Sequence, residues 1–118
     1  MIIYHKSASG RLIAELTDDA EMIPETVDIL DLIAEIGQNN CDSLIIHDSA
    51  INKDFFDLKT GFAGEILQKF SNYRVRLAIT GDFSKYPGKS LKDFMRECNR
   101  GNLIFFIPSV GEAFDRLG

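Results

Sequence analysis

The sequence has little cysteine, no long apolar run and no excess of positive charge. Cys41 and Cys98 match no metal-binding or redox spacing, which is typical of reduced thiols in the cytoplasm, although a disulfide between them stays open. No run approaches the about 20 apolar residues of a membrane helix, and the first residues turn polar too soon for a secretory signal. The net charge of -5 argues against phosphate-dependent nucleic-acid binding. We expect a cytoplasmic protein that binds neither membrane nor nucleic acid.

The composition that is present is typical of one globular domain. The 118 residues are 45% apolar and 26% charged, as in soluble globular proteins. A chain of this length buries a sizeable core without crosslinks. Since no repeat, linker or low-complexity stretch divides it, we expect residues 1–118 to form a single domain.

Short β-prone segments alternate with segments of helical periodicity along the chain. The expected strands cover residues 2–5, 11–16, 43–47, 74–79 and 103–107. The expected helices begin near Pro24, Asp57, Ser90 (as the N-terminal cap) and Val110, and end near Gly37, Ser71, Gly101 and Leu117. The resulting order is β-β-α-β-α-β-α-β-α, which builds right-handed crossovers and parallel strand pairs.

We therefore expect an α/β fold with a mixed, mostly parallel five-stranded sheet. The opening hairpin adds an antiparallel strand at one edge of this sheet. In the strand over residues 74–79, apolar side chains alternate with Arg74 and Arg76, as if one face met solvent. Residues 44–46 and 103–107 are apolar on both faces, so either helices cover both sides or an apolar strip is left for a partner. Of these alternatives, we expect helices mainly on one face.

Polar segments follow two of the expected strands and open the second helix. Because ligands of open sheets bind outside the carboxyl ends of the strands, we expect these segments to meet at one edge. The candidate ligand- or partner-binding residues are Asp48, Asp57, Lys59, Thr60, Gly61, Asp82, Ser84, Lys85 and Ser90. The sequence thus predicts a polar site at the carboxyl ends of the parallel strands.

The helix start in this set has two interpretations. Free backbone N–H groups at Thr60 and Gly61, with the charge of Lys59, favour an anion. Alternatively, Asp57 or Thr60 simply caps the helix. We expect Asp82 to be half-buried and to accept a hydrogen bond from a nearby lysine, Lys59 or Lys85.

The histidines predict little chemistry. His47 is either a general base, with Ser49 or Thr60 as the nucleophile, or a structural residue that closes a buried strand. His5 has no evident partner, and no set of histidines, cysteines and acids has the spacing of a metal site. We therefore expect no catalytic residue, metal or cofactor.

Several segments resemble the bacterial family known as domain of unknown function 4180. The resembling segments are residues 56–61, 63–73, 77–79, 81–86 and 89–94. The element order also resembles the STAS (anti-sigma-factor antagonist) fold, whose second helix opens with an Asp-Ser-Ser-Gly-like phospho-acceptor motif. Asp57, Thr60 and Gly61 lie in the equivalent place, which implies Thr60 as a phospho-acceptor, although Leu58 and Lys59 depart from the motif.

These observations lead to one functional expectation and two alternatives. We expect a non-enzymatic regulatory or protein-interaction module of STAS-like type, whose protein partner docks at residues 57–61. The first alternative is a small anionic-ligand-binding protein or enzyme with a polar site at the carboxyl ends of the parallel strands. The second is a homodimer that pairs through an exposed apolar face.

Overall fold

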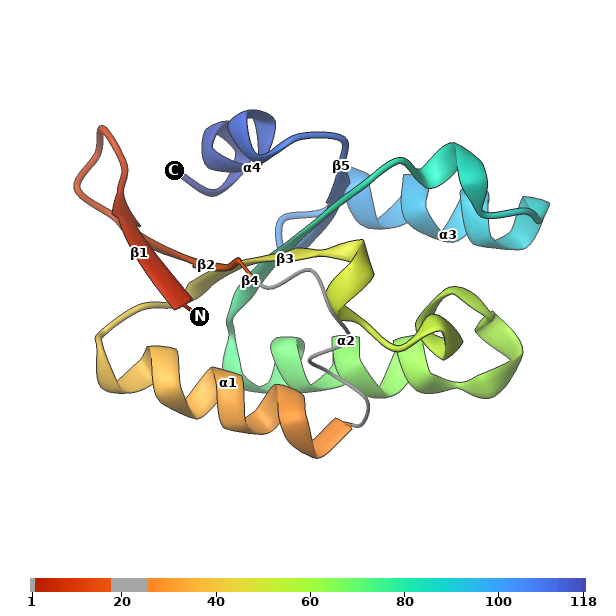
Figure 1. Cartoon of the computed structure of the whole chain (residues 1–118), viewed down its shortest axis with the longest axis horizontal. Helices are drawn as coiled ribbons and strands as arrows, with labels where there is room; N and C mark the ends of the chain where they lie inside the picture. The colour runs from red at the N-terminus through yellow and green to blue at the C-terminus, as the bar shows by residue number, and fades with distance from the viewer. Residues whose placement is uncertain (1, 18–25) are drawn as a thin grey trace.

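A five-stranded sheet forms the centre of the molecule in the computed structural model, which describes residues 2–17 and 26–118 (Figure 1). The strands are β1 (Ile2–Lys6), β2 (Leu12–Leu16), β3 (Ser43–His47), β4 (Arg76–Thr80) and β5 (Ile104–Ile107). The helices are α1 (Thr26–Gln38), α2 (Phe62–Tyr73), α3 (Lys89–Arg100) and α4 (Val110–Leu117). No helix in these two described ranges has the length and apolarity to cross a bilayer.

The strands lie side by side in the order in which they occur along the chain. β1 pairs with β2 antiparallel, and every later neighbour pairs in parallel, with Ile45 opposite Ala78 and His47 opposite Thr80. The expected mixed sheet with an antiparallel edge strand is confirmed. Because each right-handed crossover moves to the next strand in the same direction, all three crossover helices fall on the same face.

The two faces of the sheet are covered very differently. The helices α1, α2 and α3 pack on one face, where their apolar side chains join those of the strands in one large core. On the opposite face α4 alone packs over a small cluster. That cluster consists of Ile13, Ile45, Ala78, Phe105, Ile107, Ala113 and Leu117. In Figure 1, α1 and α2 lie below the sheet and α4 lies above it. The expectation of helices mainly on one face is confirmed.

Local hydrogen bonds move several element boundaries from the expected positions. α2 begins at Phe62 because residues 53–60 form two 3-10 turns, the second of which begins where Asp57 Oδ1 accepts from the Lys59 N–H at 3.2 Å. Gly61, at φ 77°, separates these turns from the helix. β4 begins two residues later than expected because Arg74, at φ 55°, still ends α2.

The start of α3 can be compared with its expected position, and the start of the first helix cannot. α3 begins at Lys89 after Gly88, so Ser90 lies inside its first turn and does not cap it, contrary to expectation. Pro24, expected in the first turn of the first helix, lies outside the described residues.

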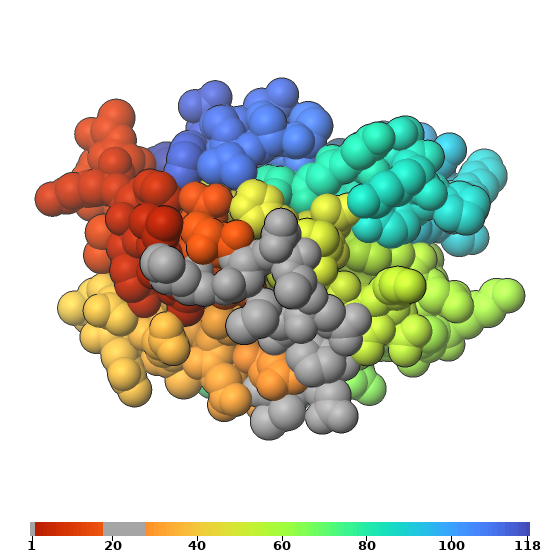
Figure 2. All heavy atoms as spheres, in the orientation of Figure 1, coloured from red at the N-terminus to blue at the C-terminus, as the bar shows by residue number. Residues whose placement is uncertain are grey.

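Figure 2 shows the β1–β2 hairpin beside α4, where the Ser9 hydroxyl donates to the Gly118 carbonyl oxygen at 3.1 Å.

Candidate functional site

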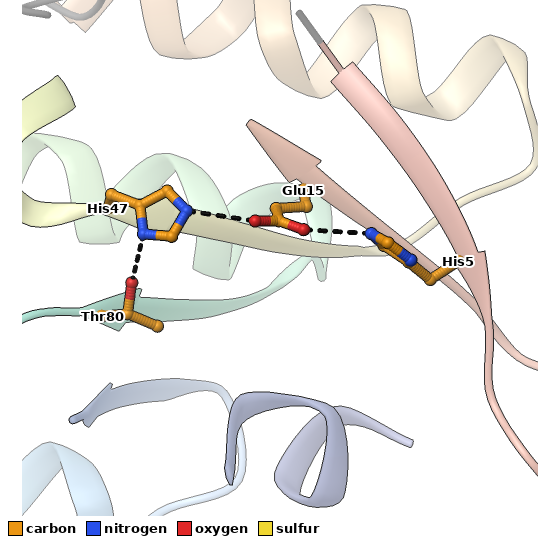
Figure 3. A network of polar contacts seen from close by, with 4 residues as sticks. All are labelled: His5, Glu15, His47 and Thr80. Atoms are coloured by element: carbon orange, nitrogen blue, oxygen red, sulfur yellow. Dashed lines mark hydrogen bonds and ion pairs between the residues drawn. The ribbon is translucent and has the colours of Figure 1, made fainter. Parts of the chain in front are cut away.

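A chain of hydrogen bonds runs across four strands on the sheet face that α4 covers (Figure 3). His5 Nε2 lies 3.0 Å from Glu15 Oε1, and His47 Nε2 lies 3.1 Å from Glu15 Oε2. His47 Nδ1 lies 2.7 Å from Thr80 Oγ1. The four residues come from β1, β2, β3 and β4 in turn, and we name them the polar ladder.

The chemistry of the bonded groups limits which atom donates in each hydrogen bond of the polar ladder. A carboxylate only accepts hydrogen bonds, so His5 and His47 each donate from Nε2 to Glu15. When the His47 ring is neutral, its Nδ1 is an acceptor and the Thr80 hydroxyl is the donor of this bond. Thr80 is 3% exposed and the Glu15 side chain 15%, so these bonds satisfy groups that have little access to water.

Sequence reasoning missed the polar ladder. The expectation that His5 has no partner is wrong, because Glu15 binds it. The hydroxyl on His47 belongs to Thr80, whereas the sequence analysis considered Ser49 and Thr60. The register of the β1–β2 hairpin would have predicted the contact between His5 and Glu15. His5 pairs with Ile13, which places Glu15 diagonally across on the same face, within reach of a long side chain.

The polar ladder ends at a hollow at the carboxyl ends of β2 to β5. The hollow has a volume of about 350 Å³. Its lining residues are Thr17, His47, Asp48, Ser49, Thr80, Gly81, Pro108, Ser109 and Val110. We name this depression the strand-end hollow. It lies where open sheets commonly bind ligands, and of the predicted site residues it includes Asp48.

Asp48 connects the strand-end hollow to the loop that follows β4. Its Oδ2 accepts from the Tyr86 hydroxyl at 2.6 Å and pairs with Lys85 Nζ at 2.9 Å. Burial alone would raise the pKa of Asp48, but the hydrogen bonds from Lys85 and Tyr86, with the charge of Lys85, outweigh it and lower that pKa. Burial first, and then the bond to Asp48, raise the pKa of Tyr86. Gly81 makes room for this carboxylate, since a Cβ there would lie 2.5 Å from Asp48 Cγ.

A second depression, of about 810 Å³, brings together three of the predicted residues, Asp57, Lys59 and Ser90. Its full lining is Lys53, Phe56, Asp57, Leu58, Lys59, Tyr86, Pro87, Gly88, Ser90 and Leu91. The Tyr86 ring stacks on the Phe56 ring with centroids 4.1 Å apart and planes at 15°. We name this depression the aromatic groove. The stacked rings, with the Asp48–Tyr86 bond, join it to the strand-end hollow.

Thr60 and Gly61 line neither depression and shape the turn before α2. Thr60 Oγ1 lies 2.7 Å from the Asp54 carbonyl oxygen and 2.9 Å from that of Asp57. The same oxygen accepts from the Phe62 N–H at 3.2 Å. Asp57 thus caps the 3-10 turn, whereas the N-cap of α2 is Gly61 without a side-chain capping bond, so the capping interpretation holds for the turn and not for α2 itself.

Asp82 and Ser84 also lie outside both depressions. Asp82 Oδ1 accepts from the Ser84 hydroxyl at 2.5 Å and from the Ser84 N–H at 3.1 Å, and these two bonds lower the pKa of Asp82. The expectation of a half-buried Asp82 bound to a lysine is wrong, because Asp82 is exposed and Lys85 pairs with Asp48. The predicted residues thus spread over two depressions and two turns.

Comparison with known proteins identifies the family of the chain. Within residues 2–17 and 26–118, no three His, Cys, Asp or Glu side chains group closely enough to hold a metal ion. No curated protein and no solved structure matches the chain. One family model, described as Domain of unknown function (DUF4180), matches residues 8–117. Because this match covers almost the whole sequence, the chain belongs to the DUF4180 family of domains of unknown function.

Proposed function

We propose that the protein is a regulatory module that binds an acidic segment of a protein partner in the aromatic groove. The observation that carries this proposal is the combination of apolar walls and positive charge in one depression. Phe56, Leu58 and Tyr86 are half-buried there and leave apolar surface open to a partner. The groove is large enough for several side chains of an extended peptide.

The charges of the groove indicate the character of the partner. Lys53 and Lys59 are exposed at the groove, against one acid, Asp57, whereas the chain as a whole carries a net charge of -5. An acidic partner segment is therefore attracted to this place, against the negative net charge of the chain as a whole. An aromatic or aliphatic side chain of the same segment would fill the space beside the stacked rings of Phe56 and Tyr86.

The polar groups at the groove favour binding over catalysis. The Asp57 carboxylate accepts from the Lys59 N–H, so the 3-10 turn that carries these residues is held in place before a partner arrives. Among the described residues that line the groove there is neither histidine nor cysteine. The bonds of this turn pre-organise a docking surface.

A regulatory role fits the position of Thr60, beside the groove. Its hydroxyl bonds hold the turn over residues 54–57 against the start of α2. A phosphoryl group on Thr60 would remove the hydrogen bond that its hydroxyl donates and add negative charge next to Lys59. This would lower the affinity of the groove for an acidic partner segment. We also propose a cytoplasmic location, in keeping with the free thiols of Cys41 and Cys98.

Selection of peptides from a random displayed library on the full chain tests the proposed docking. We expect enriched peptides to combine acids with one aromatic or aliphatic anchor. Their affinity, measured by fluorescence polarisation, should fall at least about 10-fold in the double variant Lys53→Glu, Lys59→Glu, since both favourable charges are reversed. Leu58→Asp should abolish binding by placing a charge on the apolar wall.

The matched control changes a lysine far from the groove. Lys6 is exposed at the outer edge strand β1, so Lys6→Glu makes the same kind of charge reversal at one residue and should leave the affinity almost unaltered. Enriched peptides that bind the double variant as tightly as the unaltered protein would exclude the groove as the docking site.

A further inference from the structure

The polar ladder and the strand-end hollow share His47 and Thr80, and neither residue lines the aromatic groove. We propose that the Thr80 hydroxyl, activated by His47, accepts the acyl group of a small carboxylic ester bound in the strand-end hollow. This inference goes beyond the proposed function and does not depend on partner binding.

The hydrogen-bond pattern at Thr80 is that of an activated nucleophile. A hydroxyl is a weak nucleophile until a base takes its proton, and the base must be held by a third group. Thr80 Oγ1 lies 2.7 Å from His47 Nδ1, within reach for the neutral ring to take the hydroxyl proton, and Glu15 holds the opposite ring nitrogen at 3.1 Å. His5 binds the second oxygen of Glu15 at 3.0 Å and fixes the carboxylate in turn. Figure 3 shows the three bonds as a continuous chain from His5 through Glu15 and His47 to Thr80.

The position of the ladder distinguishes it from ordinary core packing. Ile45 and Ala78, which directly precede the ladder positions of β3 and β4 on that face, belong to its apolar cluster, and Ser43 of β3 is a further buried polar residue there. Burying polar groups is unfavourable, and apolar side chains would fill these places more stably. Moreover, the ladder ends where His47 and Thr80 line a hollow, so a small molecule there would meet the bonded hydroxyl.

The surroundings of the hollow favour an acyl group over a phosphoryl group. A dianionic phosphoryl donor would face the carboxylates of Asp48 and Glu15, of which Lys85 offsets only the one on Asp48. A carboxylic ester is neutral, and its tetrahedral intermediate places one negative charge on one oxygen. α4 begins at the rim with Val110. The Ser109 hydroxyl caps the N–H of Glu112 at 3.3 Å, so the N–H groups of Val110 and Gly111 are the ones suited to stabilise that oxygen. A volume of about 350 Å³ suits a short acyl chain.

The proposed reaction balances with an ester and water as its only reactants. Thr80 Oγ1 attacks the carbonyl carbon, the bond from that carbon to the alcohol oxygen breaks, and the hydroxyl proton passes through His47 Nδ1 to the departing alkoxide. The products are an alcohol and an acyl ester on Thr80. Water then attacks the acyl carbon and gives its proton to His47 Nδ1, which returns it to Thr80 as the free acid leaves.

Acetylation by p-nitrophenyl acetate tests the site on the full chain. We expect release of p-nitrophenolate above the buffer rate, with the acetyl group located on Thr80 by peptide mass spectrometry. Thr80→Val and His47→Gln should each lower the release rate at least about 100-fold, because the nucleophile or its base is removed. Thr80→Ser keeps a hydroxyl and should keep the acetylation. Ser71→Ala, an exposed hydroxyl on α2, is the matched control and should change nothing.

Glu15 is a positioning residue, and its test needs a separate measurement. In Glu15→Gln the carboxylate that orients His47 is lost, so the pH dependence of acetylation should change as well as the rate. A substitution that acted only on packing would lower the yield of folded protein and leave the pH profile of the folded fraction unaltered.

Three outcomes would overturn the proposal. These are release no faster than in buffer, acetyl groups on lysines alone, or a Thr80→Val protein that reacts as fast as the unaltered chain. If Thr80→Val does not fold by circular dichroism, the mapped adduct in the unaltered chain and in Thr80→Ser decides the question. The double variant Lys53→Glu, Lys59→Glu should still be acetylated, so failure at the aromatic groove and failure at this site remain distinguishable.

Discussion

The two faces of the sheet differ in what holds their helices. Three helices share one large apolar core with the strands on the first face. On the second face, α4 covers a small cluster and is also tied by polar contacts. Arg76 donates to the carbonyl oxygens of Leu117 at 3.0 Å and Arg116 at 2.7 Å, at the end of the helix, and the Arg116 guanidinium lies 4.2 Å from the centre of the Phe105 ring.

The first face of the sheet contributes most of the stability, and the second face carries the polar ladder and the strand-end hollow. The first face buries most of the apolar surface, and burial of apolar surface dominates the free energy of folding. The thinly covered second face has room for the polar ladder and for the strand-end hollow. We therefore expect substitutions on the first face to change the free energy of unfolding most, and substitutions on the second face to change local structure and reactivity.

The largest expected effect compares one leucine from each face. Leu77 in β4 and Leu117 in α4 are both 0% exposed. Leu77→Ala should lower the free energy of unfolding by about 4 kcal/mol, since the packed core around it cannot collapse into the cavity. Leu117→Ala should lower it by about 2 kcal/mol, because the last turn of α4 can shift. Urea unfolding of both variants gives the comparison, and equal losses would break it.

A smaller effect is expected from removing the polar tie of α4. Arg76→Met keeps the apolar stem and removes the guanidinium, which leaves the carbonyl oxygens at the end of α4 without their charged donor. The free energy of unfolding should fall by about 2 kcal/mol. Hydrogen exchange should rise in α4 and remain slow in α1 and α2. A uniform rise over all helices would show that α4 is not a separate unit.

Asp48→Asn removes the charged acceptor of the Tyr86 hydroxyl. At neutral pH this should lower the free energy of unfolding by about 1 kcal/mol, and the loss should depend on pH. The folded-state pKa of Asp48 is lowered, so its ionised form stabilises the fold above the ordinary carboxyl pKa, and that stabilisation is lost as the pH falls through the folded value. The gap in stability between the unaltered chain and Asp48→Asn should therefore close in acid.

The same variant has a spectroscopic control at the other end of the pH scale. Absorbance titration of Tyr86 should move toward the ordinary phenol pKa in Asp48→Asn, because one cause of its raised value is removed. Burial, the larger cause, remains, so the return should be partial. An unaltered titration would place Tyr86 away from Asp48 in solution.

The smallest effect belongs to the exposed surface of α3. Lys89 Nζ lies 2.8 Å from Asp93 Oδ2, but the Lys89 side chain is 89% exposed. Lys89→Ala should change the free energy of unfolding by less than about 0.5 kcal/mol, because water screens such a pair. A loss as large as that of Leu117→Ala would contradict the assignment of stability to buried apolar contacts.

The fold was predictable from the sequence because its main signals are local. Alternation of β-prone and helical segments predicts the element order, and the right-handed crossover rule then predicts the parallel pairing and the placement of the helices. The boundaries were less predictable, since they depend on single backbone bonds. The carboxylate of Asp57 and the left-handed conformation of Arg74 move α2 and β4 by a few residues.

The candidate site was predictable only where one rule was sufficient. The binding rule for open sheets predicted a polar site at the carboxyl ends of the strands, and of the nine predicted residues Asp48 lines a hollow there. The polar ladder joins residues from four strands, so finding it requires the register of each neighbouring pair, and His5 gives no local sign of Glu15. The groove required the fold of the turns over residues 53–60, which bring Phe56 against Tyr86.

The agreement between strand order and chain order has a consequence for how the polypeptide folds. Each strand lies beside its neighbour in the chain, so every strand pairing spans a hairpin or one crossover helix. A sheet that joins strands more distant in the chain has a higher contact order and folds more slowly. We expect the sheet to grow from its amino-terminal hairpin outward, one crossover at a time, and refolding after a denaturant jump to be fast for an α/β domain of this size.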